Sequence, residues 1–234
     1  MLKEKHSYKF LLIKTIEING EELYVLEDPF GKRHTLPTIY YTHYQLNVPS
    51  EVVCKIDKIN CTGRIFLEPE HPFYKIGGIY QFKIIEIRKI EDTLYRYSSE
   101  MEYKSYEIVV TDCNNQPHYV TPYRWQLHKK YNAQYINCVV LRITAGKFHL
   151  KNLDKQHPYF KIGEEYKFKF IKIKNVLDEN NNIQVVCELK GTDGYIYTAP
   201  AELHQLHPKY KKNYIVCKIM DIESGDLILE QLNV

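Results

Sequence analysis

The chain repeats itself, and this internal repetition is the feature that most limits the folds open to its 234 residues. The heptapeptide HPFYKIG at residues 71–77 returns as HPYFKIG at residues 157–163. Each copy leads into a Tyr-x-Phe-Lys segment, and a shorter copy, Tyr-Lys-Phe at residues 8–10, opens the chain. Because self-similarity at a fixed spacing is the signature of a repeat architecture, we expect three structural units of one fold.

The far end of each unit recurs as well. A cysteine within an apolar stretch is followed, after eight or nine residues, by a glycine that begins a second apolar run. These residues are Cys54, Cys138 and Cys217, followed by Gly63, Gly146 and Gly225. A proline lies 17, 16 and 17 residues before the three cysteines. The predicted domains are therefore residues 1–73, 74–158 and 159–234.

The composition indicates β-structure. The sequence has 21 tyrosines and 9 phenylalanines but only four alanines, and strands favour aromatic side chains whereas helices favour alanine. Alternation of apolar and basic residues along residues 166–170 predicts a strand with one buried face. Two adjacent apolar residues then reverse that alternation at residues 170–171, as they do at 12–13 and 84–85. We expect a β-bulge at each of these points.

Each unit reads as five strands with one short helix before the fourth, which is the order of an oligonucleotide-binding (OB) barrel. The helix candidates are residues 38–46, 124–130 and 201–207. The chain resembles the OB superfamily and is most similar to its S1-like branch. The carrying residues are VCKIDKI at 53–59 and GRIFLE at 63–68, since S1 domains end in a Val-x-Lys-Val strand, an Ile-Asp turn and a Gly-Arg-Ile-x-Leu strand. The resemblance implies an all-β protein with short helices, built from three tandem five-stranded OB-like barrels.

The cysteines and histidines form no catalytic or metal-ligand pattern. No Cys-x-x-Cys occurs, and the nearest pair, Cys54 and Cys61, lies seven residues apart, so zinc ligation is not expected. The three recurring cysteines are interpreted as small buried core residues. His71 and His157 each precede a proline, and we interpret both as structural residues at the end of a strand. We therefore expect no catalytic residues, no metal, no cofactor and no enzymatic activity.

The sequence also bears on location. No apolar stretch approaches the ~20 residues that a helix needs to cross a bilayer. The apolar run at residues 10–13 is too short for a signal peptide and has no small-residue cleavage site. Unpaired cysteines without a secretion signal favour a reducing compartment. We expect a cytoplasmic protein with no membrane partner.

Positive charge is concentrated in the middle unit. Residues 74–158 hold 13 basic and 8 acidic residues, whereas residues 8–73 hold 7 and 9, and residues 159–234 hold 10 and 11. The middle unit also has the longest first loop, residues 90–105, and the single tryptophan. In OB barrels the first loop and the second and third strands frame the ligand face. A basic groove with aromatic side chains at that face binds single strands.

Basic and aromatic residues interleave in the first loop, the third strand and the helical segment of the middle unit. The candidate nucleic-acid-binding residues are Tyr95, Arg96, Tyr97, Lys104, His118, Tyr119, Tyr123, Arg124, Lys129 and Lys130. Trp125 lies among them, and we interpret it as a plug for the end of a barrel. The alternative for the tyrosines is half-buried packing with the hydroxyl at the surface.

The sequence thus predicts binding of single-stranded RNA or DNA, with RNA favoured, led by the middle unit. The alternative is a protein–protein interaction scaffold or adaptor built from OB-like modules, because the outer two units are slightly acidic and fold alone does not separate these functions. A third possibility is a companion protein that recruits substrate for a separate enzyme without catalysis of its own.

Overall fold

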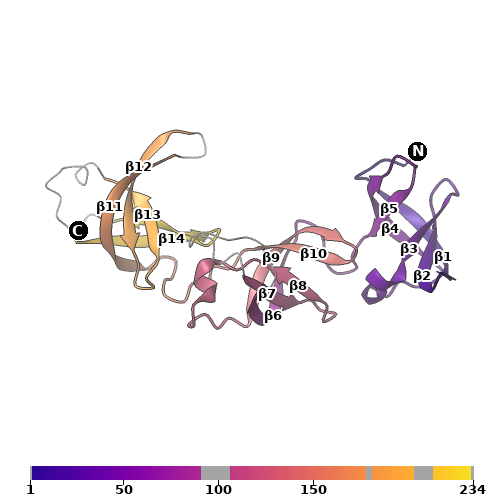
Figure 1. The fold of residues 1–234 in the computed structure, drawn as a ribbon, viewed down its shortest axis with the longest axis horizontal. Coiled ribbons are helices and arrows are strands. Elements are labelled where there is room, and N and C mark those ends of the chain that lie inside the picture. Colours follow the sequence, from indigo (N-terminus) through magenta and orange to yellow (C-terminus); the bar gives the residue numbers. More distant parts are fainter. Residues whose placement is uncertain (1, 91–105, 178–180, 203–212, 233–234) are drawn as a thin grey trace. The chain divides into compact units, whose positions relative to one another are not determined.

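The protein is all-β over the residues that the computed structural model describes, which are 2–90, 106–177, 181–202 and 213–232 (Figure 1). Its strands form three five-stranded antiparallel sheets, and one sheet is nearly closed into a barrel. The predicted all-β fold class is confirmed. No helix in the described ranges reaches seven residues.

The strands follow one another along the chain in three groups of five. The first sheet contains β1 (Ser7–Ile18), β2 (Glu21–Glu27), β3 (Arg33–Pro37), β4 (Ser50–Ile59) and β5 (Ile65–Pro69). The second contains β6 (Ile79–Lys89), β7 (Tyr106–Thr111), β8 (Pro117–Val120), β9 (Tyr135–Thr144) and β10 (Lys147–Asn152). The third contains β11 (Glu165–Leu177), β12 (Ile183–Lys190), β13 (Ile196–Pro200), β14 (Tyr214–Glu223) and β15 (Asp226–Gln231).

All three sheets have the same strand order. The third strand pairs with the second, the second with the first, the first with the fourth and the fourth with the fifth. In the third sheet β13 also lies against β15, so the two edge strands meet and the sheet curves into a nearly closed barrel. The three sequence repeats therefore correspond to three sheets with the same topology.

The helical segment between the third and fourth strands is short, as predicted. It consists of the 3-10 turns η1 (Thr38–Tyr40) and η2 (Thr42–Tyr44) in the first sheet's segment. The turn η4 (Arg124–Leu127) stands at the matching place after β8. The third candidate, residues 201–207, falls mostly outside the described residues.

Two of the three predicted bulges are confirmed, in the long first strands β1 and β11, and the one at residues 84–85 stays a prediction. The β1–β2 pairing shifts register between Leu12 and Lys14, and the β11–β12 pairing shifts between Phe170 and Lys172. Each shift coincides with the reversed alternation in the sequence. A bulge bends a strand and increases its twist, which lets one strand serve two sides of a small barrel.

The entry into each first strand is also built three times in the same way. The backbone N–H groups of Lys5, Gly77 and Gly163 donate to the carbonyl oxygens of Ile56, Val140 and Ile219 on the fourth strand. All three donors have positive φ, of 63°, 83° and 88°. Glycine adopts this left-handed conformation without steric cost. The first copy has Lys5 at this position in place of the glycine of the other two copies.

The recurring cysteines lie in the sheet cores, as predicted. Cys54, Cys138 and Cys217 each have no exposed surface. Burial raises the pKa of the Cys54 and Cys217 thiols to about 12. A thiol with a raised pKa is a poor nucleophile and a poor metal ligand, so these residues act as small apolar core side chains.

Trp125 is buried as the sequence indicated. It is 1% exposed and belongs to the same apolar cluster as Phe160 and as Phe168 and Cys217 of the third sheet. Full burial of a side chain of this size contributes about 3 kcal/mol or more. η4 therefore delivers Trp125 and Gln126 into the interior and leaves Arg124 exposed.

The described contacts divide the chain into two compact units. The first unit comprises residues 1–86, 108–120 and 137–151, and the second comprises 87–107, 121–136 and 152–234. The domain boundaries at residues 73 and 158 stay a prediction.

Helices of the length and apolarity that a bilayer crossing requires do not occur in the described ranges.

Candidate functional site

Four of the ten predicted binding residues cannot be placed. Tyr95, Arg96, Tyr97 and Lys104 lie outside the described residues. The other six fall into both compact units: His118 and Tyr119 belong to the first, and the residues from Tyr123 to Lys130 belong to the second.

His118 does not face solvent. It is 2% exposed, its Nε2 lies 3.3 Å from Asp112 Oδ2, and its ring stacks on Phe148 with centroids 4.0 Å apart. Burial alone would raise the pKa of Asp112, but hydrogen bonds from His118 and two backbone amides outweigh it, and the pKa is lowered. His118 is therefore a structural partner of Asp112 and offers no surface to a ligand. Its neighbour Tyr119, on β8, is 47% exposed.

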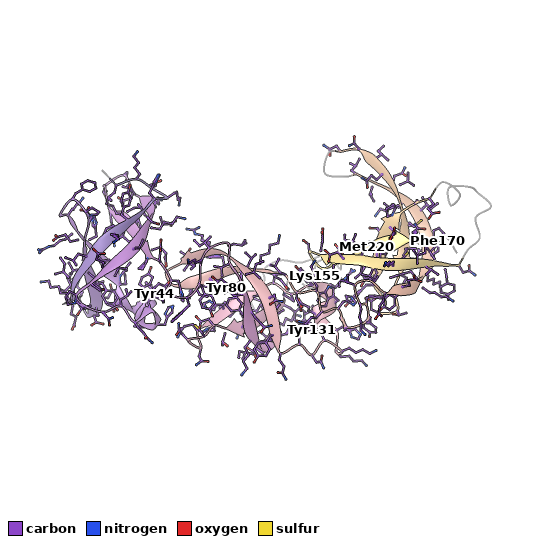
Figure 2. All side chains as sticks on the ribbon, turned by 180° about the vertical axis from the view of Figure 1, so that it is seen from behind. Tyr44, Tyr80, Tyr131, Lys155, Phe170 and Met220 are labelled. Atoms are coloured by element: carbon purple, nitrogen blue, oxygen red, sulfur yellow. The ribbon has the colours of Figure 1, made fainter. Side chains whose placement is uncertain are left out.

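The remaining candidates lie on the loop of residues 123–131, which a buried glutamine holds in place. Gln126 is 1% exposed, and its Oε1 accepts the backbone N–H of Tyr123 at 2.7 Å, which closes the first turn of η4. The same Oε1 accepts Asn152 Nδ2 at 2.7 Å, while Gln126 Nε2 donates to Asp154 Oδ2 at 3.0 Å. Tyr131, labelled in Figure 2, donates its hydroxyl to the same Asp154 oxygen at 2.6 Å.

This network fixes both ends of the loop, because a buried polar group is costly unless its hydrogen bonds are made. Trp125 anchors the middle. Trp125 and Gln126 are buried, whereas Arg124, Lys129 and Lys130 are exposed. The loop thus presents three cations from a rigid support.

Two of these cations lie over tyrosine rings of the second unit. The Arg124 guanidinium carbon is 4.3 Å from the Tyr195 ring centroid, and Lys130 Nζ is 4.3 Å from the Tyr159 ring centroid. Both distances are within the ~6 Å range of a cation–π interaction. We call Arg124, Lys129, Lys130, Tyr159 and Tyr195 the basic-aromatic surface.

Further contacts hold the two rings. The Tyr195 hydroxyl donates to the Arg124 carbonyl oxygen at 3.3 Å, and the Tyr159 hydroxyl is 2.9 Å from His128 Nε2. Burial raises the pKa of the Tyr195 phenol, and the Arg124 charge opposes part of that rise. Tyr195 is therefore neutral at pH 7.

Two carboxylates next to residues of this loop and of the Tyr195 turn are buried. The Asp154 side chain is bound in the Gln126 network, and the Asp193 side chain is 1% exposed beside His157. The basic-aromatic surface is therefore suited to a ligand that carries negative charge and flat rings.

Tyr159 and Tyr195 were missed by the sequence reasoning, which confined the candidates to the middle repeat. Tyr159 stands in the recurring HPYF segment, and Tyr195 directly follows the turn of the third repeat. The available signal was that both are aromatic residues in turns, where side chains commonly reach the surface.

A second feature was not predicted from the sequence. Each repeat pairs the aspartate of its hairpin turn with a residue of the third strand. These pairs are Asp28 with His34, Asp112 with His118, and Asp193 with Tyr197. In the first two pairs the aspartate also accepts two backbone amides of its own turn. This geometry is that of a buried turn support.

Clusters of three or more His, Cys, Asp or Glu that could hold a metal do not occur among the described residues. No protein-family model and no curated protein matches the chain. The geometry of the surface is therefore the basis for a functional proposal.

Proposed function

We propose that this protein is a non-enzymatic, cytoplasmic OB-fold protein that binds single-stranded nucleic acid, with RNA preferred over DNA. The observation that carries the proposal is the basic-aromatic surface of the second unit, where Arg124 and Lys130 lie over tyrosine rings. Single-strand binders combine cations along the phosphate backbone with flat side chains against the bases.

The fold supports the same proposal. The OB barrel has the strand order found in all three sheets, with the third strand closing on the fifth, and β13 and β15 show that closure. The closing hairpin that resembles S1 domains corresponds to β4–β5. This hairpin and the β14–β15 hairpin carry a register shift at the same place, after Ile56 and after Ile219.

Fluorescence anisotropy with a labelled single-stranded RNA of about 12 nucleotides tests the proposal. Three phosphate contacts predict affinity that falls about 10- to 20-fold between ~50 and ~200 mM salt. A DNA strand of the same sequence should bind more weakly. The double variant Arg124→Glu, Lys130→Glu should weaken RNA binding by at least about tenfold at the lower salt.

The matched control is Lys167→Glu, Lys190→Glu, which reverses the same number of charges at exposed positions of the third sheet. It should retain most of the wild-type affinity. If both double variants lost RNA affinity equally, the loss would follow from net charge alone, and the proposal would be contradicted. Absence of RNA binding at low salt would favour a protein-interaction scaffold instead, whose partners would survive nuclease treatment in a pull-down.

A further inference from the structure

The first unit contains a cleft of about 710 Å³ that the basic-aromatic surface does not include. Its walls come from β1, β4, β5, the turn before β6, and β9. Small-molecule sites commonly occupy about 300–1,000 Å³ and combine an apolar lining with a few polar groups. The cleft therefore has the size for one small ligand.

One wall is set by strand register. Ser7 on β1 stands opposite Lys55 on β4, and Lys55 stands opposite Glu68 on β5. The three side chains therefore share the face of the sheet that points away from the core. Cys54, next to Lys55, points the other way and is fully buried.

Two of the three carboxylates in the cleft are already neutralised or satisfied. Asp57 accepts both Lys5 Nζ, at 2.9 Å, and Arg142, at 3.0 Å. The lysine hydrogen bond is the main reason that the pKa of Asp57 is lowered. Two cations on one carboxylate leave this side of the cleft with an excess positive charge.

Glu68 is engaged by hydrogen-bond donors. Its two carboxylate oxygens accept the backbone N–H groups of Ala145, at 2.7 Å, and Gly146, at 3.2 Å, and the hydroxyl of Tyr41 at 3.2 Å. These three neutral donors take up three of the roughly four acceptor sites of the carboxylate. Lys55, its cross-strand neighbour, forms no ion pair with it among the described residues.

Lys75 adds a further cation at the cleft, and Glu70 is the remaining carboxylate. The lining thus holds four cations and three carboxylates, and two of the cations, Lys5 and Arg142, are paired with Asp57. The apolar part of the lining includes Ile76, 50% exposed, and Leu141, 55% exposed. Exposed aliphatic side chains beside cations suit a ligand with an anionic end and an apolar ring.

We propose that this cleft binds a phosphate monoester of mononucleotide size, with the phosphate at Lys55 and Lys75 and the base against Ile76 and Leu141. This inference does not rest on the proposed function, because it concerns the other compact unit. The ligand is either a free nucleotide or the terminal nucleotide of a strand, since both carry the same phosphate and ring.

Titration of the full chain with AMP, followed by amide chemical shifts in NMR spectra, tests the site. AMP should shift the amides of Ser7, Lys55, Lys75 and Leu141. The variant Lys55→Glu, Lys75→Glu should bind AMP at least about tenfold more weakly, as expected when charge-assisted bonds to a phosphate are lost. The control Lys14→Glu, Lys147→Glu changes two exposed lysines outside the cleft and should bind AMP as the wild type does.

Two further experiments distinguish a free nucleotide from a strand end, and this site from the basic-aromatic surface. Displacement of AMP by a 5′-phosphorylated single-stranded RNA would assign the site to a strand end, and retention of AMP would assign it to a free nucleotide. Arg124→Glu, Lys130→Glu should leave AMP binding unchanged, so failure here is distinct from failure of the proposed function. The site is contradicted if AMP shifts no amides of the cleft, if both lysine pairs have the same effect, or if inorganic phosphate binds as tightly as AMP.

Discussion

The two histidines that precede the repeated prolines occupy matching places in the two compact units, yet their surroundings differ. His71 Nδ1 accepts the backbone N–H groups of Phe73 and Tyr74, at 3.1 and 3.2 Å. His157 Nδ1 accepts that of Tyr159 at 3.2 Å. Each ring therefore acts as a cap for the turn that follows it, which confirms the structural interpretation of both residues.

The difference lies at the other ring nitrogen. His157 Nε2 is 3.3 Å from the Tyr197 hydroxyl and 3.5 Å from Asp193 Oδ2. His71 Nε2 and the hydroxyl of the adjacent Tyr44 are both buried and have no hydrogen-bond partner among the described residues. The same histidine cap thus has hydrogen-bond partners for its Nε2 in the second unit, whereas in the first unit the Nε2 has none among the described residues.

The largest effect should follow from removing the aromatic residue that covers His157. Trp125→Ala deletes a fully buried side chain whose ring centroid is 5.0 Å from that histidine. We expect a loss of about 3–5 kcal/mol in the free energy of unfolding of the second unit. Faster amide hydrogen exchange in β11 and β14, with β1 and β4 unchanged, would show it. Equal acceleration in both pairs of strands would contradict the separation into units.

Acid should destabilise both histidine environments. Burial lowers the pKa of His71 and His157 from 6.5 to about 4, because it penalises the charged ring. The unfolded chain therefore binds protons first, and stability is lost as the pH falls from about 6.5 towards 4, by on the order of 2 kcal/mol per histidine. Urea unfolding at several pH values measures this dependence.

The variant His71→Asn, His157→Asn supplies the control for the acid effect. The Asn Oδ1 can accept the same backbone amides but does not titrate. The slope of stability against pH between 6.5 and 4 should flatten in this variant. An unchanged slope would assign the acid sensitivity to other groups.

Removing a hydroxyl should have opposite consequences in the two units. Tyr197→Phe deletes the hydroxyl that donates to Asp193 and lies 3.3 Å from His157 Nε2. It should lower the free energy of unfolding of the second unit by about 1–2 kcal/mol. The fluorescence of the single tryptophan, which lies in the second unit, reports its unfolding. A change below about 0.5 kcal/mol would mean that the Asp193 and His157 contacts are not formed in solution.

Tyr44→Phe is the matched change in the first unit and should have the smallest effect. Its hydroxyl is buried without a partner among the described residues, so its removal should be neutral or slightly stabilising, within about 0.5 kcal/mol. Amide exchange in β1 and β4 measures the result. A clear loss of stability would reveal a hydrogen bond to the Tyr44 hydroxyl and remove the contrast between the units.

The fold was accessible from the sequence because its signals are local. The recurring cysteines, the turn glycines and the reversed alternation at residues 12–13 and 170–171 each report on a short stretch of chain. Alternation could also have placed His118: Val120 is apolar and two residues away on β8, so both point to the core while Tyr119 points out.

The site was accessible only in part, because it depends on contacts between distant residues. Arg124 meets Tyr195 across 71 positions, and Lys130 meets Tyr159 across 29. No local pattern encodes either pairing. The charge distribution pointed to the middle repeat, which contains Arg124 and Lys130. The rings of Tyr159 and Tyr195, over which these cations lie, belong to the third repeat.

Ultraviolet crosslinking of single-stranded RNA to the full chain, with the crosslinked peptides identified by mass spectrometry, tests the central claim most directly. Flat side chains in contact with bases crosslink readily, so peptides that contain Tyr159 or Tyr195 should carry the RNA. In the variant Arg124→Glu, Lys130→Glu these crosslinks should disappear. Crosslinks confined to other peptides, or unchanged crosslinks in the variant, would contradict the claim that the basic-aromatic surface binds the strand.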